Sequence, residues 1–164
     1  MFRRSGREIG LTPRDFDISA LETIADLTNK SCREVYHYWT ELDATVPFNV
    51  EQLLDLPSHL PIICLVDRVA NEDDFIFKFV GQKIVTVTKR DLTGTRVLAG
   101  QSKAVLTKGF CRYFLSHEGP AISSNAFTVT QNGIEHRFEE AIGLPLRGER
   151  GMGDRYLIVH GMQD

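Results

Sequence analysis

The sequence predicts an α+β protein, with a five-stranded antiparallel sheet, helices on one face of that sheet and a long N-terminal helix. Residues 62–66 form a continuous apolar run typical of a central strand, and residues 75–80 alternate with the period of two that strands show. Asn132-Gly133, a strong hairpin-turn signal, stands between two further alternating runs. Because two strands precede the helical segment and three follow it, the pattern favours an antiparallel α+β arrangement.

The composition and charge exclude several classes of protein. The 164 residues suffice for one domain with its own core. A net charge of −3 gives no reason to expect a nucleic-acid partner. No apolar run reaches the roughly 20 residues that cross a bilayer, so we expect no membrane insertion. Cys32, Cys64 and Cys111 form no Cys-x-x-Cys pair, and the N-terminus lacks the apolar core of a secretory signal, which together predict a cytoplasmic location.

The chain divides into an arm, a helix and a domain. Residues 1–17 are basic with little to bury, so we expect a flexible N-terminal arm. Residues 18–44 predict one long helix that begins at a capping box of Ser19 and Glu22. Residues 45–164 then hold the strands and shorter helices of the domain.

Side chains recur along the predicted helix at alternating steps of four and three, which is the spacing of a coiled-coil stripe. The stripe can pack on the chain's own sheet or pair with the same helix of a second copy, as a dimer interface. Its members are Leu21, Ala25, Thr28, Cys32, Val35 and Trp39.

The remaining elements follow from local patterns. Phe75, Phe77 and Phe79 fall on one face of the second strand, which Gly81 ends. Residues 101–117 have one broad apolar face and predict a helix. A two-residue turn at Asn132-Gly133 fixes the register of the hairpin around it. The facing pairs are then Phe127 with Phe138 and Val129 with His136.

Several short motifs resemble a PAS-like domain family of small, mostly alphaproteobacterial proteins. The most recognisable is the Arg-Asp-Leu-Thr-Gly block at residues 90–94, and Tyr38-Trp39 and residues 60–63 match two further motifs. Lys78 and Gln82 depart from the family pattern, in which we expect arginine and threonine.

The resemblance implies a stand-alone PAS domain that acts as a non-catalytic sensory or protein-interaction module in cytoplasmic bacterial signal transduction. Its output would pass to a partner in trans, such as a histidine kinase or another regulator, and its N-terminal helix would form a homodimer. In a PAS fold the ligand cavity lies between the concave sheet face and the helix that crosses it. The implied ligand-binding residues are Phe79, Leu106, Phe110, Cys111, Phe114, His117, Phe127, His136 and Phe138.

The aromatic side chains of this set allow two interpretations. They fill the space as a packed core, which we favour, or they line a pocket for an apolar metabolite or for haem held by His117 or His136. Flavin is not expected beside Cys111, because Phe110 stands where flavin-binding light sensors have asparagine and Tyr113 interrupts the motif that follows. We predict no cofactor, and no metal, because metal-ligand spacings such as His-x-x-x-His are missing.

Enzyme signatures are missing as well. The sequence has no Gly-x-Ser-x-Gly motif and no phosphate-binding glycine loop, so we expect no catalytic residues. The alternative is a small α+β enzyme of the isomerase or dehydratase type. Such an enzyme needs a buried acid in its pocket, and Glu140 is the candidate.

Overall fold

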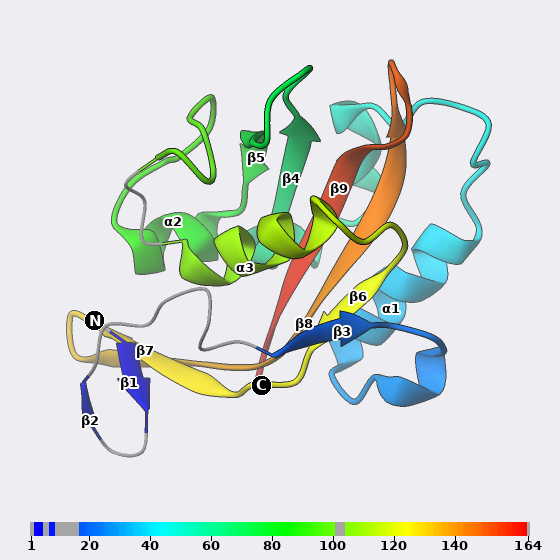
Figure 1. The fold of residues 1–164 in the computed structure, drawn as a ribbon. Helices are drawn as coiled ribbons and strands as arrows, with labels where there is room; N and C mark the ends of the chain where they lie inside the picture. The colour runs from blue at the N-terminus through cyan, green and yellow to red at the C-terminus, as the bar shows by residue number, and fades with distance from the viewer. Residues whose placement is uncertain (1, 5–6, 9–16, 101–103, 164) are drawn as a thin grey trace.

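The computed structural model describes residues 2–4, 7–8, 17–100 and 104–163, the first two ranges by their backbone alone. Within this part of the chain, nine strands form one antiparallel sheet (Figure 1). In chain order these are β1 (Phe2–Arg4), β2 (Arg7–Glu8), β3 (Ile18–Ala20), β4 (Ile63–Arg68), β5 (Phe75–Val80), β6 (Ala121–Ser123), β7 (Phe127–Gln131), β8 (Ile134–Gly148) and β9 (Gly151–Met162).

The main path of the sheet runs β2-β1-β7-β8-β9-β4-β5. Two strands pair with the same edge of the long strand β8: β7 pairs with its first part, and β6 pairs with it farther along. Strand β3 in turn pairs with β6. The predicted hairpin register is confirmed, with Phe127 opposite Phe138 and Val129 opposite His136. The arm expected over residues 1–17 lies largely outside the described residues, although the backbone of β1 pairs with β7.

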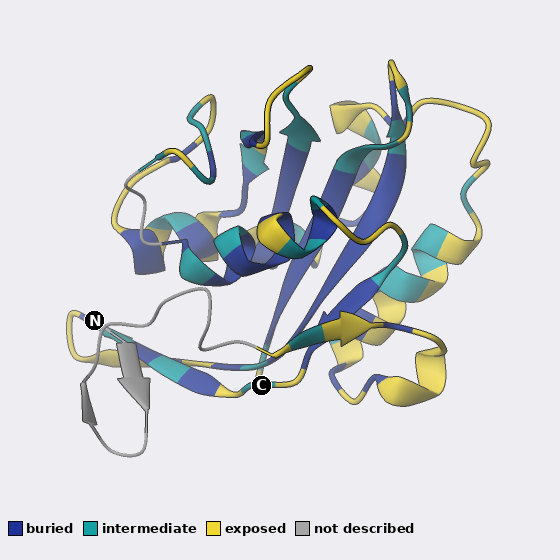
Figure 2. Ribbon diagram, in the orientation of Figure 1, coloured by how far each residue is buried: buried dark blue, intermediate teal, exposed yellow. Residues whose placement is uncertain are grey.

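Helices cover both faces of the sheet, which corrects the prediction that they lie on one face. The helices are α1 (Lys30–Thr40), α2 (Gln82–Thr88) and α3 (Val105–Phe114), and the 3-10 segments are η2 (Ile24–Asp26), η3 (Val50–Asp55) and η4 (Leu60–Ile62). Figure 1 shows α3 lying across β4 and β9, with α1 next to β8. Successive residues of β4 alternate between the two cores: Cys64 and Val66 pack under α2 and α3, whereas Ile63 and Leu65 pack with α1. All four are buried, which explains the continuous apolar run (Figure 2).

The long N-terminal helix predicted over residues 18–44 is not present. The α-helix starts at Lys30, where the backbone N–H of Cys32 donates to the Asn29 side chain at 3.0 Å. Before it, β3 pairs with β6, and Leu21 donates its backbone N–H to the carbonyl of Pro120 at 2.9 Å. The first half of the periodic stripe therefore lies outside the helix, in a segment that contacts with distant parts of the chain hold in place. Only the second half of the stripe is helical.

Strand β5 contains an irregularity that changes the side on which Phe79 packs. Leu65 faces Phe79 across the pair, but the next residue, Val66, faces Phe77, so the register shifts by one residue. Phe75 and Phe77 consequently join the core under α3, while Phe79 packs against the core on the α1 side. The prediction that all three phenylalanines share one face is wrong for Phe79.

Candidate functional site

The space between α3 and the sheet is filled by aromatic side chains. Phe110 and Phe114 are buried on the inner side of α3, and the Phe114 ring stacks on Tyr156 of β9 with 3.9 Å between ring centroids. Phe127 stacks on Phe138 at 5.1 Å. A pocket beside Leu106, between α3 and the sheet, measures about 30 Å³. That volume admits about one water molecule, so it excludes haem.

The structure brings together six of the nine residues predicted to line a ligand cavity. They share one core, and they are Leu106, Phe110, Cys111, Phe114, Phe127 and Phe138. His117 is exposed and stacks on Tyr113 with 4.2 Å between ring centroids. His136 is buried on β8, where desolvation, followed by the charge of Lys83, lowers the pKa of its imidazole. Phe79 lies on the other side of the sheet.

This core contains a buried chain of hydrogen-bonded polar groups that the sequence did not predict. The imidazole of His160 lies 3.2 Å by Nδ1 from the Ile62 carbonyl and 3.1 Å by Nε2 from the Thr107 hydroxyl. Since the carbonyl can only accept, Nδ1 carries the proton and Nε2 accepts from Thr107. Burial lowers the pKa of His160 to about 4 and raises that of the neighbouring Cys64 thiol to about 12. Both groups are therefore neutral at physiological pH, and the chain holds α3 to the sheet.

Glu140 is buried, as an enzymatic acid would require, but its carboxylate is occupied by backbone. Its oxygens accept the backbone N–H groups of Thr28 and Asn29, each at 3.0 Å, and the Thr28 hydroxyl at 3.1 Å. These donors stand at the start of α1, where the helix dipole favours a negative charge. The arrangement gives Glu140 a structural role at the beginning of that helix.

A much larger pocket lies on the opposite side, between the end of α1 and the β8–β9 hairpin. We call it the Trp39 pocket. It measures about 480 Å³, which falls within the range of roughly 300–1,000 Å³ typical of small-molecule sites. Its walls are mainly apolar, with Ala44 and Pro145 beside Trp39, Leu42, Val46, Phe48, Leu146 and Met152. Its polar members are Thr40, Asp43, Gln52 and Arg147.

Hydrogen bonds fix the walls of the Trp39 pocket. The Trp39 indole donates from Nε1 to the Pro145 carbonyl at 2.8 Å, which joins α1 to β8. The backbone N–H of Phe48 donates to the Arg147 carbonyl at 2.8 Å, and Arg147 donates from Nε to the Ala44 carbonyl at 2.7 Å. Segments distant in the sequence are thus tied together around a preformed cavity.

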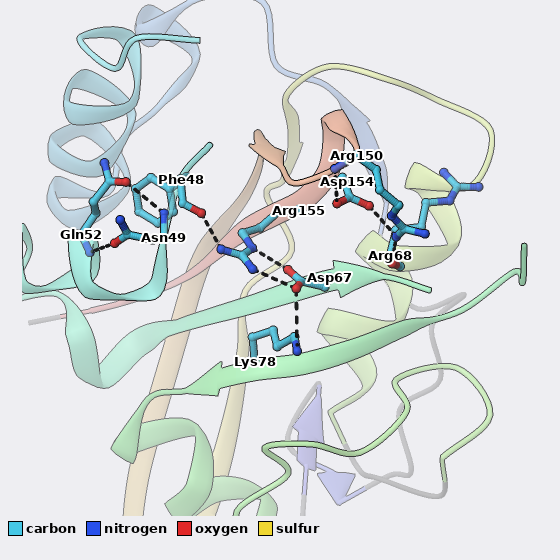
Figure 3. A network of polar contacts seen from close by, with 9 residues as sticks. All are labelled: Phe48, Asn49, Gln52, Asp67, Arg68, Lys78, Arg150, Asp154 and Arg155. Atoms are coloured by element: carbon cyan, nitrogen blue, oxygen red, sulfur yellow. Dashed lines mark hydrogen bonds and ion pairs between the residues drawn. The ribbon is translucent and has the colours of Figure 1, made fainter. Parts of the chain in front are cut away.

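A partly buried ion pair holds the backbone of Phe48 in place. Figure 3 shows Arg155 of β9 reaching both the Phe48 carbonyl and the Asp67 carboxylate on β4. The guanidinium donates to Asp67 in a fork, from Nε at 2.5 Å and from Nη2 at 2.9 Å. These hydrogen bonds raise the pKa of Arg155 above its ordinary value. Lys78 of β5 completes the cluster at 4.0 Å from Asp67.

Sequence reasoning assigned Trp39 to a dimer stripe and did not find this pocket. Of the six stripe residues, Leu21, Cys32 and Val35 are buried in the chain's own core. Ala25 and Thr28 are exposed in the segment before α1, and Trp39 is half-buried in the pocket wall. Half of the stripe therefore packs within one chain, and the homodimer stays a prediction. A usable signal was the stretch 41–49, in which Val46 and Phe48 are large apolar residues outside any helix or strand.

Comparison of the chain with models of protein families, with curated proteins and with solved structures finds no match. Across the described residues, no helix combines the length and the apolar character needed to cross a bilayer. Function must therefore be inferred from the residues and their geometry.

Proposed function

We propose that the chain is a PAS-like, non-catalytic module that senses or relays a signal in the bacterial cytoplasm through contact with a partner protein. The observation that carries this proposal is the arrangement of the sheet around α3. Strands β4 and β5 precede α2 and α3, the short strand β6 and the longer strands β7, β8 and β9 follow them, and β4 pairs with β9. Apart from the short strand β6, this order agrees with that of the PAS resemblance, and α3 lies across the sheet as the family implies (Figure 1).

The filled interior supports a module that works through its surface. The aromatic face of α3 packs against β8 and β9, and the pocket beside Leu106 holds about 30 Å³, which is too small for a sizeable ligand. Glu140, the candidate acid of an isomerase-like enzyme, is engaged by the backbone at the start of α1. Three free, buried cysteines agree with a reducing compartment.

Exposed apolar side chains on and near η3 suggest where a partner binds. Leu54 is 72% exposed and lies on η3 together with Val50, which is 40% exposed. Gln52 of the same segment lines the Trp39 pocket, and Val46 and Met152 at that pocket are exposed as well. Clustered, exposed apolar side chains are common at protein interfaces.

The proposal is tested by affinity purification of the tagged chain from its own cells, with quantitative mass spectrometry. We expect a histidine kinase or another signalling regulator to be enriched with the wild-type chain and lost with Leu54→Ser. Ile134→Ser is the matched control, since Ile134 is 61% exposed on the β7–β8 hairpin and its loss leaves η3 intact. Failure to enrich any signalling protein with the wild-type chain would contradict the proposal.

A native mass spectrum of the purified protein, recorded together with its absorption spectrum, tests the remaining parts. We expect a colourless protein with no bound haem or flavin mass, and the same spectrum reports whether the predicted homodimer forms. A visible absorption band with a matching cofactor mass would contradict a module without a prosthetic group.

A further inference from the structure

We infer that the Trp39 pocket binds a free α-amino acid that carries a bulky apolar side chain. This inference goes beyond the proposed function and does not depend on it, because it concerns only which ligand the pocket accepts. It rests on three features: an apolar interior, two opposite charges that do not pair with each other, and their position on either side of one peptide unit of the pocket wall.

The interior of the pocket suits an apolar side chain. Trp39, Phe48 and Leu146 present an indole, a phenyl ring and a branched aliphatic group to the same cavity. Apolar walls with a few placed polar groups are the usual composition of small-molecule sites. The indole N–H is already taken by the Pro145 carbonyl, so Trp39 offers the ligand an apolar surface.

The pocket also contains one anion and one cation that do not pair with each other. The Asp43 carboxylate accepts the backbone N–H of Thr45 at 2.9 Å and its hydroxyl at 2.6 Å, both through Oδ1, and these bonds lower its pKa. Asp43 is therefore ionised, and its Oδ2 accepts no hydrogen bond from the described residues. Arg147 uses Nε alone, on the Ala44 carbonyl. Among the described residues no ion pair joins the two, and the Nη groups of Arg147 have no hydrogen-bond partner.

The two charged groups bind the two sides of one peptide unit, the one that joins Ala44 to Thr45. Arg147 binds the carbonyl of Ala44, the residue that directly follows Asp43, so the guanidinium and the carboxylate flank one short stretch of loop. An α-amino acid presents its ammonium and its carboxylate from one carbon atom, which matches this placement. Arg147 can receive the ligand carboxylate through its Nη groups, and Asp43 can receive the ammonium. The side chain then points toward Trp39.

The chain provides its own reporter for the test, because Trp39 is its single tryptophan. L-phenylalanine is titrated into the full chain while the indole fluorescence is followed, and calorimetry gives the affinity independently. Three matched probes each lack one recognition element: 2-phenylethylamine lacks the carboxylate, 3-phenylpropionate lacks the ammonium, and L-alanine lacks the bulky side chain. We expect each to bind roughly tenfold more weakly than L-phenylalanine or worse.

Two variants locate the binding site. Asp43→Asn keeps the carbonyl oxygen that caps Thr45 and removes only the charge, and Arg147→Lys keeps the charge but loses the planar fork. We expect Asp43→Asn to bind L-phenylalanine roughly tenfold more weakly while 3-phenylpropionate is unaffected or improved. No heat and no fluorescence change with L-phenylalanine would overturn the inference. Binding of 3-phenylpropionate as tight as that of L-phenylalanine would also overturn it, since the pocket would then select apolar acids.

Discussion

The ring of Phe114 lies directly over Gly143 of β8. A Cβ atom added at Gly143 would meet Phe114 Cζ at 2.6 Å and Phe110 Cδ1 at 2.9 Å, closer than side chains pack. The missing side chain thus lets α3 settle onto the sheet. It also lets Phe114 reach Tyr156 on the neighbouring strand. This close approach explains why the interior is a core and not a cavity.

Gly143→Ala is expected to destabilise the protein by about 1–3 kcal/mol, because the added methyl group overpacks the space under Phe114. Urea unfolding followed by circular dichroism measures the loss. The double variant Gly143→Ala with Phe114→Leu should lose less than the sum of the two single losses, since the smaller side chain relieves the clash. Additive losses would show that the methyl group and the ring do not meet.

Glu140→Gln is expected to lower the free energy of unfolding by about 1–3 kcal/mol, because an amide replaces an oxygen that accepts buried N–H groups at the start of α1. Glu139→Gln is the matched control. Among the described residues the Glu139 carboxylate accepts from the Asn29 side chain alone, at 2.8 Å, and the amide oxygen of glutamine can still do so. Equal losses in the two neighbouring variants would argue against the structural role of Glu140.

Thr107→Val keeps the shape of the side chain but removes the hydroxyl that donates to His160 Nε2. We expect a loss of about 1–3 kcal/mol in unfolding free energy, since a buried acceptor is left without a donor. Thr107→Ser restores the hydroxyl and should recover part of that stability. A valine variant as stable as the wild type would mean that the buried chain from His160 to Cys64 contributes nothing.

Stability should fall as the pH is lowered from neutral toward 4. Burial lowers the pKa of His160 to about 4 in the folded state, from an ordinary value of 6.5. Between these values the unfolded chain binds a proton that the folded chain does not, so acid favours unfolding, by a loss on the order of 3 kcal/mol. His136 contributes in the same direction. Urea midpoints measured from pH 7.5 to 4 test this, and His160→Gln should flatten the profile.

Local patterns predicted those parts of the fold that local chemistry decides. The Asn132-Gly133 turn allows one register, and the pairing of Phe127 with Phe138 follows from it. The apolar run of β4 marks a strand covered on both faces, even though the placement of helices on a single face was wrong. The helix predicted over 101–117 corresponds to α3 at Val105–Phe114, with residues 101–103 outside the described part.

The rest depends on contacts between distant segments. Hydrogen bonds with Glu140 and Asn29 fix the start of α1, and Glu140 lies on a strand far along the chain. The heptad-like spacing from Leu21 onward does not reveal these contacts, so the predicted helix began too early. The bulge in β5 leaves no signal in an alternating sequence, which is why Phe79 was assigned to the wrong face. The Trp39 pocket is assembled from α1, the following loop and the β8–β9 hairpin, so no single stretch of sequence displays it.

A crystal structure determined under xenon pressure tests the central claim most directly, because xenon enters apolar cavities that are large enough to hold it. The account predicts xenon in the Trp39 pocket, against the indole and Phe48, and none between α3 and the sheet. Xenon density among Phe110, Phe114 and Phe127, with the Trp39 pocket left empty, would contradict it.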